Sequence, residues 1–125
     1  MTQTAARSYH DLALDLHRRV PVVDGHADTL DRSIEEGVPF GPEQPMLHID
    51  VPRMREVGLN LQVLSLWVPP DHKGDRALHR ALRMASCFYE GMRADSSVRL
   101  VSRAEDIVPD RPGFVFSFEG AEPLA

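Results

Sequence analysis

The residues with the clearest chemical potential form a His-x-Asp pair, His26 and Asp28, within the segment DGHAD at 24–28. Apolar residues precede the pair, so it closes a predicted short buried strand over residues 21–26. Side chains two positions apart in a strand point the same way, so the His26 nitrogen and the Asp28 oxygen can converge on one ion. Imidazole with carboxylate suits zinc and related divalent metals. The pair therefore predicts one side of a metal site.

A His-x-Asp pair is weak evidence when it stands alone. With six histidines in the chain, about half of one such pair is expected by chance. The sequence carries a second pair, His48 and Asp50, directly before Val51-Pro52. There Asp50 is better interpreted as a helix N-cap with Pro52 in the first turn. We therefore expect no metal at His48, and His26 is the better candidate because it closes a strand.

A third candidate ligand, Glu119, closes the segment GFVFSFE at 113–119, which is a predicted strand. Alternation places the three phenylalanines on one face and Val115, Ser117 and Glu119 on the other. If the phenylalanine face packs under helices, Glu119 lies at the rim of the opposite face. A carboxylate there could bridge two metals, which lie about 3.5–4 Å apart in two-metal sites. The periodicity equally allows a solvated glutamate at the end of a strand.

Asp24 lies two residues before His26, on the same face of the predicted strand. A carboxylate there can accept the second ring N–H of a ligand imidazole. We favour this interpretation over the alternative, in which Asp24 caps local backbone. The other candidate groups have structural interpretations: His10, His17 and His79 are predicted to be solvated, Cys87 to be a small buried residue, and Trp67 to pack in the core.

The elements that must position these residues follow from the hydrophobic spacing and from proline and glycine. The predicted helices cover residues 9–20, 51–58 and 75–92, with a short one over 102–107. The predicted strands cover residues 21–26, 60–68 and 113–119, with a brief one over 98–101. Residues 31–50, which hold several prolines and glycines, are predicted to form one long loop.

Strands that alternate with helices indicate βα units and a parallel sheet. A parallel sheet needs both faces covered, and no helix is predicted after the last strand. A complete (β/α)₈ barrel takes about 250 residues, twice the length available. We therefore expect an α/β fold that forms about the first three βα units of a TIM-type barrel. Residues 1–125 would be the N-terminal portion of a single barrel domain.

The composition limits the classes of function. The chain has 14 basic and 19 acidic residues and a net charge of −5, without the basic patch that a nucleic-acid surface needs. Its single cysteine excludes an intrachain disulfide. The polar residues at the start lack the apolar region of a secretory signal, and no apolar stretch is long enough to span a bilayer. We expect a cytoplasmic protein without a nucleic-acid or membrane partner.

Three segments together resemble the membrane (renal) dipeptidase family of zinc metallopeptidases, in the amidohydrolase superfamily. They are VVDGHADTL at 22–30, HIDVPRMREVGLNLQVLSLWV at 48–68 and FVFSFEGAEPL at 114–124. The resemblance implies a (β/α)₈ barrel that holds two zinc ions. His26 and Asp28 would bind the more buried ion, and Glu119 would bridge both. A metal-activated water would then hydrolyse the peptide bond of a dipeptide substrate.

The resemblance also implies residues that lie outside this sequence. The family takes two further histidine ligands and a catalytic aspartate from later strands, so no catalytic residue is assigned within this chain. We expect the chain to be inactive alone unless a homo-oligomer completes the site. Two alternatives stay open. One is another amidohydrolase acting on an N-acyl amide or a lactam, against which Asp28 argues because such relatives more usually carry His-x-His. The other is a truncated, non-catalytic relic.

Overall fold

The computed structural model describes residues 7–96, 98–109 and 111–124. The strands are β1 (Val23–Ala27), β2 (Leu61–Trp67), β3 (Arg99–Leu100) and β4 (Gly113–Glu119). The α-helices are α1 (Tyr9–His17), α2 (Thr29–Glu36), α3 (Val51–Val57) and α4 (Ala77–Ala94). Short 3₁₀ turns lie at Pro70–His72, Gly74–Arg76, Ala104–Asp106 and Glu122–Leu124. Residues 1–6, which begin the stretch predicted to lack a secretory signal, lie outside the described residues.

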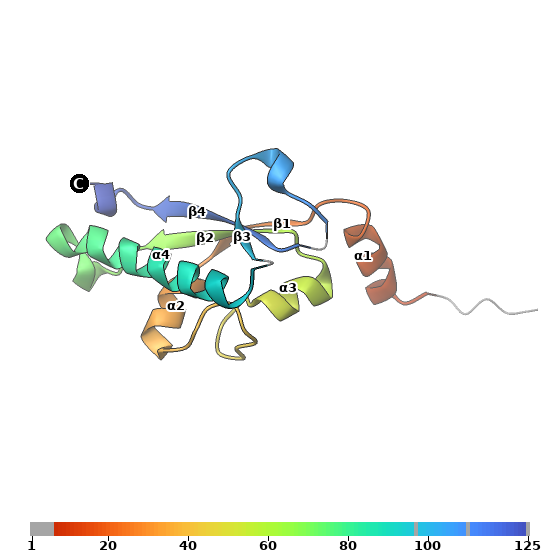
Figure 1. Ribbon diagram of the computed structural model, residues 1–125, viewed down its shortest axis with the longest axis horizontal. Coiled ribbons are helices and arrows are strands. Elements are labelled where there is room, and N and C mark those ends of the chain that lie inside the picture. The colour runs from red at the N-terminus through yellow and green to blue at the C-terminus, as the bar shows by residue number, and fades with distance from the viewer. Residues whose placement is uncertain (1–6, 97, 110, 125) are drawn as a thin grey trace, which may run out of the picture.

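The four strands form one parallel sheet in the order β1-β2-β4-β3 (Figure 1). β4 pairs with β2 in unbroken register, from Leu61 opposite Gly113 to Trp67 opposite Glu119. The fold is therefore α/β with the parallel βα units of a partial TIM-type barrel, as predicted. The brief β3 lies at the far edge of the sheet, and the predicted short helix after it is the 3₁₀ turn at Ala104–Asp106. In the described residues, no helix is long and apolar enough to cross a membrane.

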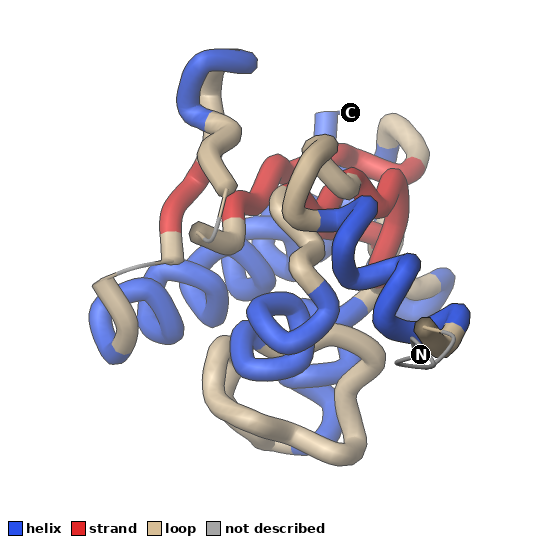
Figure 2. Tube along the Cα trace, turned by 90° about the vertical axis from the view of Figure 1, so that its right-hand side faces the viewer, coloured by secondary structure: helices blue, strands red, loops and turns tan. Residues whose placement is uncertain are grey.

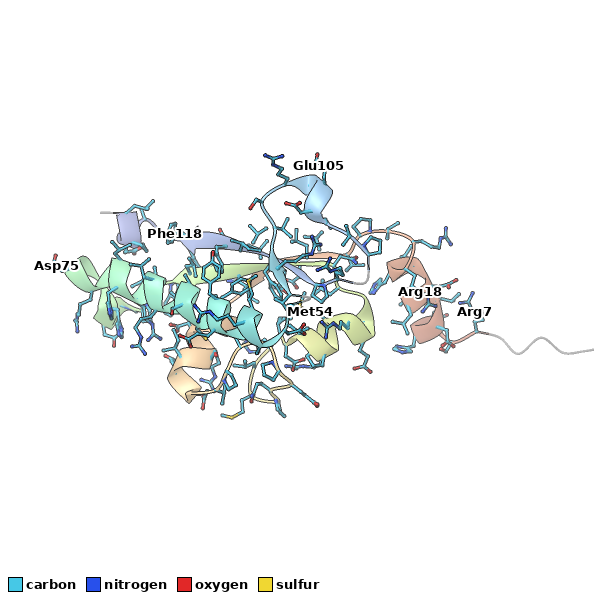
Figure 3. The ribbon with its side chains drawn as sticks, viewed as in Figure 1. Arg7, Arg18, Met54, Asp75, Glu105 and Phe118 are labelled. Atoms are coloured by element: carbon cyan, nitrogen blue, oxygen red, sulfur yellow. The ribbon has the colours of Figure 1, made fainter. Side chains whose placement is uncertain are left out.

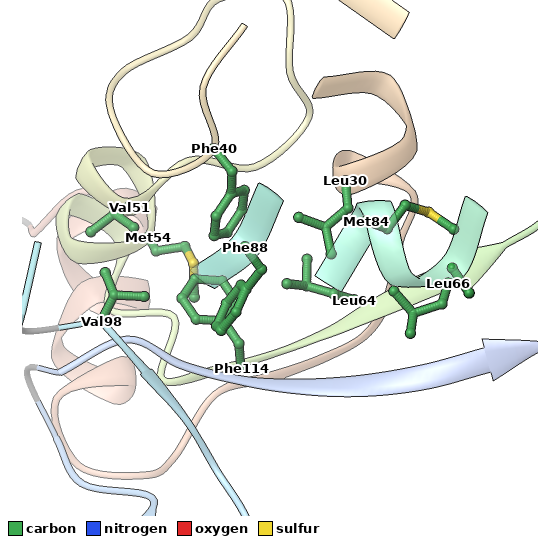
Figure 4. Packing of buried hydrophobic residues seen from close by; sticks show 11 residues of the cluster. Leu30, Phe40, Val51, Met54, Leu64, Leu66, Met84, Phe88, Val98 and Phe114 are labelled. Atoms are coloured by element: carbon green, nitrogen blue, oxygen red, sulfur yellow. The ribbon is translucent and has the colours of Figure 1, made fainter. Parts of the chain in front are cut away.

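The core lies between the sheet and helices α2, α3 and α4, which share one of its faces (Figures 1 and 2). Its centre is an aromatic cluster of Phe40, Phe88 and Phe114, each at most 1% exposed. Their ring centroids are 5.3–5.5 Å apart, in tilted or edge-to-face contact (Figure 4), the geometry that the ring quadrupoles favour. Phe40 comes from the proline-rich loop, so this cluster fixes the loop against α4 and β4.

The phenylalanine face of β4 packs against the helices only at its beginning. Phe114 is fully buried, and Phe116 packs against the core and lies 5.0 Å, ring to ring, from Phe88. Phe118, at the far end of β4, is 43% exposed (Figure 3). The prediction that this face points toward the helices therefore holds for the first two phenylalanines.

The predicted loop over residues 31–50 is wrong at its start, because α2 occupies Thr29–Glu36. Leu30 and Ile34, one turn apart, face the core, and Gly37 ends the helix in the left-handed conformation at φ 65°. Two apolar residues among several charged ones give too short a pattern to recognise by periodicity. The rest of the segment, residues 37–50, is irregular as predicted.

In two of the predicted helices, some apolar residues that recur at helical spacing lie outside the buried face. In α4, Leu78 and Leu82 are 51% and 60% exposed, whereas Arg80 and Met84 are buried. The whole of α1 contains no buried residue, and its Leu12 and Leu16 are about half exposed. Helical spacing therefore indicates both helices, but the spacing alone does not decide which side of a helix meets the sheet.

Arg80 is buried because it pairs with Asp31 across the α2–α4 contact. Its Nε and Nη2 both donate to Asp31 Oδ1, the first at 2.9 Å. The two side chains are only 6% and 8% exposed. Taking two charges out of water costs free energy that only their mutual contact offsets, so each residue depends on the other.

We predict that Asp31→Ala lowers the free energy of unfolding by about 3–5 kcal/mol, because it leaves the Arg80 charge buried without its partner. Urea denaturation measures the loss. The double variant Asp31→Leu, Arg80→Met should recover most of it. The partly exposed Arg32–Glu36 pair serves as the control, because Glu36→Ala should cost at most about 1 kcal/mol. Equal losses for Asp31→Ala and Glu36→Ala would contradict this account.

The N-terminus of α3 forms as the sequence predicts, with Asp50 as its N-cap. Asp50 is fully buried and accepts hydrogen bonds from the backbone N–H groups of Arg53 and Gln44 and from Arg53 Nε at 2.7 Å. Burial raises the pKa of this carboxyl, but these hydrogen bonds together outweigh burial, so the pKa lies below its ordinary value. In the second His-x-Asp pair of the sequence, the aspartate is therefore a helix cap.

A lowered folded-state pKa means that ionised Asp50 stabilises the fold above its ordinary pKa of 3.8. That contribution is lost as the pH falls through the folded-state value. We predict that Asp50→Asn costs about 1–3 kcal/mol at pH 7 and that the difference from the unmodified chain shrinks below pH 3.8. Urea unfolding at a series of pH values measures it, with the exposed Asp75→Asn as control. A difference that does not change with pH would refute the assignment.

Candidate metal centre

The three predicted ligands meet at the carboxyl edge of the sheet. His26 lies near the end of β1, Asp28 directly follows that strand, and Glu119 is the last residue of β4. In a parallel sheet all strands end at one edge, which the arrowheads of β2 and β4 mark in Figure 1. This edge is where the active sites of barrel enzymes lie.

Their side chains converge on one point. His26 Nε2 lies 3.3 Å from Asp28 Oδ1 and 3.3 Å from Glu119 Oε2. One potential ligand atom from each residue lies within 4.8 Å of the other two, and no other such group of three occurs among the described residues. The side chains are 48–54% exposed. The convergence expected from the sequence is present, and metal binding by these residues stays a prediction.

The chemistry of the cluster fits a divalent cation. Asp28 Oδ1 is buried, yet within the described chain it has no hydrogen-bond partner. It faces the imidazole nitrogen, and Glu119 faces the same nitrogen from the other side. A buried acceptor without a partner costs about 1–3 kcal/mol, and more if charged, and the two carboxylates repel each other. A cation held between one nitrogen and two oxygens would offset both costs.

A register irregularity in β1 aims His26 at this point. Asp24 pairs with Gln62 and Ala27 pairs with Leu64, so β1 advances three residues while β2 advances two. The extra residue is a β-bulge, which changes the face on which the following side chains lie. Asp24 and His26 therefore lie on opposite faces, and the prediction that they share one is wrong. The predicted burial of this strand is also wrong, because only Ala27 of β1 is buried.

Asp24 supports the backbone of His26 and not its ring. Asp24 Oδ1 accepts from the His26 backbone N–H and from Gln62 Nε2, both at 2.9 Å. These two hydrogen bonds hold the pKa of the Asp24 carboxyl below its ordinary value, and the one from the His26 backbone has the larger effect. The structure thus favours local backbone capping, the alternative left open by the sequence. The structure also shows a contact of Gln62 that the sequence did not indicate. Gln62 is fully buried, but in the sequence it is only one polar residue inside an apolar strand.

We predict that Gln62→Leu raises the pKa of Asp24 toward its ordinary value of 3.8, because it removes one of the two hydrogen bonds to the ionised carboxylate. Titration of the Asp24 side-chain carbon by NMR measures the change. Gln44→Leu is the matched control, because Gln44 lies in the loop before α3 and approaches Asp50 through its backbone N–H. An unchanged Asp24 pKa in Gln62→Leu would rule out the hydrogen bond as the cause.

The remaining candidates lie away from the cluster or have other contacts. His48 and His79 are exposed, the latter as predicted. The His17 ring, predicted to be solvated, contacts the backbone carbonyl of Val57. Cys87 is partly buried against the core, with Sγ 3.3 Å from Ser33 Oγ.

Trp67 is the exception near the cluster. It was predicted to pack in the core, but it is 37% exposed and pairs in register with Glu119 at the end of β2.

The fold and this cluster together define an α/β protein of the barrel type with a candidate metal centre at the carboxyl edge of its sheet. The chain belongs to the membrane dipeptidase family, peptidase family M19, whose model matches residues 10–125. Membership in this family confirms the resemblance predicted from the sequence.

Solved structures of metallopeptidases are similar to the chain. One is a dipeptidase AC, a metallopeptidase of family M19, with 25% sequence identity and a TM-score of 0.67 over 83% of this chain and 36% of that one. Another, a metallopeptidase from Rhodobacter sphaeroides, is liganded with a phosphinate mimic of the dipeptide L-Ala-D-Ala. It has 21% identity and a TM-score of 0.67 over 83% of this chain and 39% of that one, and at this identity it supports the fold alone. No curated protein matches the chain. The chain spans well under half the length of both relatives.

Proposed function

We propose that this chain forms the N-terminal portion of a zinc-dependent dipeptidase site in which His26, Asp28 and Glu119 are metal ligands. The observation that carries the proposal is the buried Asp28 Oδ1, which has no hydrogen-bond partner in the described residues and lies 3.3 Å from His26 Nε2. The family supports peptidase chemistry. The family model is that of membrane dipeptidases, which supports a dipeptide as the substrate.

Each side chain has a distinct role in this proposal. His26 would offer Nε2 as the nitrogen ligand, with its backbone fixed by Asp24. Asp28 would supply a carboxylate oxygen from the same strand end, and Glu119 would reach across from β4 to bridge two ions. When bound, the metal would lower the pKa of a water molecule toward neutrality and so supply the attacking hydroxide. Because β1 and β4 both pair with β2, the spacing between the ligand strands is set by the sheet.

These three residues could hold one metal ion, but they cannot complete a site for two. Structural and catalytic zinc sites use three or four ligands in fixed geometry, and a two-ion site needs more. The resemblance to the family implies two further histidines and a catalytic aspartate from later strands. We propose that they complete the site in the whole protein, or that a homo-oligomer does so for this chain. The cytoplasmic location stays a prediction.

The test is metal analysis of the purified chain together with hydrolysis of L-Ala-D-Ala. We expect zinc to co-purify or to bind on addition. His26→Ala and Glu119→Gln should each lower zinc affinity at least about tenfold to a hundredfold, since losing even an outer-sphere partner costs that much. His48→Ala is the matched control, because it removes the histidine of the other His-x-Asp pair and should leave zinc affinity unchanged.

The outcomes separate the candidate functions. Zinc binding with dipeptide hydrolysis supports the proposal in full, and zinc binding without hydrolysis supports the site but not an active chain. Hydrolysis of a lactam or an N-acyl amide in place of the dipeptide would favour the alternative amidohydrolase. A folded chain whose zinc affinity is the same with and without His26 would contradict the metal site itself.

A further inference from the structure

The central strand β2 contributes none of the three candidate ligands, yet one of its side chains contacts the cluster. Ser65 Oγ donates a hydrogen bond of 3.0 Å to Glu119 Oε2. That oxygen is the one that lies 3.3 Å from His26 Nε2. Ser65 is only 2% exposed, so its hydroxyl approaches the cluster from inside the protein and not from solvent.

We propose that Ser65 is a positioning residue for Glu119: its buried hydroxyl fixes the carboxylate in the orientation that faces His26 and Asp28. This inference rests on the proposed metal site and adds to it a residue that binds no metal. Ser65 would act only through Glu119, by limiting the conformations that the glutamate side chain samples.

The sheet register explains why Ser65 can reach Glu119. Ser65 pairs with Ser117, and Glu119 lies two residues further along β4 on the same face. Such diagonal neighbours lie within reach of long side chains. Placed on the buried β2, the serine is rigid and can serve as a fixed point for the longer glutamate.

Glu119 needs such a fixed point. Its side chain is half exposed, and ordering a glutamate side chain costs up to about 1.5–2 kcal/mol of rotamer entropy. A hydroxyl that already holds one oxygen reduces the part of this cost that metal binding must offset. A carboxylate oxygen also has two lone pairs, so Oε2 can accept from Ser65 and still coordinate a cation.

A purely structural explanation exists, because a buried hydroxyl needs a hydrogen-bond partner wherever it lies. Under that explanation Ser65 contributes to folding stability alone, and its removal leaves metal affinity unchanged. The two explanations therefore predict different results for metal binding by the same variant.

The experiment measures Co²⁺ affinity of the purified chain by its visible absorption, with thermal unfolding of the metal-free proteins alongside. Ser65→Ala should bind Co²⁺ about 10–100-fold more weakly, the usual loss for a partner of a metal ligand. Ser117→Ala is the matched control, since Ser117 lies opposite Ser65 on the same face but donates to the backbone carbonyl of Phe118. We expect it to bind Co²⁺ like the unmodified chain.

Three results would overturn the inference. The first is that Ser65→Ala binds Co²⁺ as tightly as the unmodified chain, and the second is that both serine variants weaken binding equally. Either result removes the specific link to Glu119 and leaves the metal site standing. If the unmodified chain fails to bind Co²⁺ at all, the proposed function fails and this inference fails with it.

Discussion

The parallel pairing of β2 with β1 on one side and β4 on the other is the constraint on which the candidate site depends. His26 and Asp28 come from one outer strand and Glu119 from the other, so the distance between them is set by two rows of backbone hydrogen bonds. The β2–β4 register is unbroken, whereas the β1–β2 register contains the bulge that turns His26 toward the cluster. The candidate site thus depends on one strand pair in regular register, β2–β4, and on one that contains a bulge, β1–β2.

The helical side of the sheet holds this arrangement in place. The aromatic cluster fixes β4 against α4, and the buried Arg80–Asp31 pair fixes α2 against the same helix. Since α2 begins at Thr29, directly after Asp28, that ion pair also anchors the strand end that carries two of the candidate ligands. Packing on the helical face of the sheet therefore stabilises the positions of the candidate ligands at the carboxyl edge.

The elements that could be predicted from the sequence are those with a regular spacing of apolar residues or a local end signal. Strands β2 and β4, the helix α4 and the cap at Asp50 follow from local patterns, and the candidate ligands follow from residue types at strand ends. The bulge at Gly25–His26, the buried Arg80 and the contacts of Gln62 and Ser65 were not predictable in this way, because each depends on a partner distant in sequence. In a sequence, a residue whose charge or amide is buried in the fold appears only as a polar residue within an apolar stretch.

Asp28 occupies two structural positions at once. It stands at the N-cap of α2, where an aspartate ordinarily bonds the free N–H groups of the first turn, but its side chain makes no such bond. Capping is worth about 1 kcal/mol to a helix, and here that stabilisation is forgone so that the carboxylate can face His26. The backbone of Asp28, at φ −88° and ψ 24°, is also outside the extended conformation that a capping residue typically adopts. At this residue, helix stability and ligand geometry compete for the same two oxygen atoms.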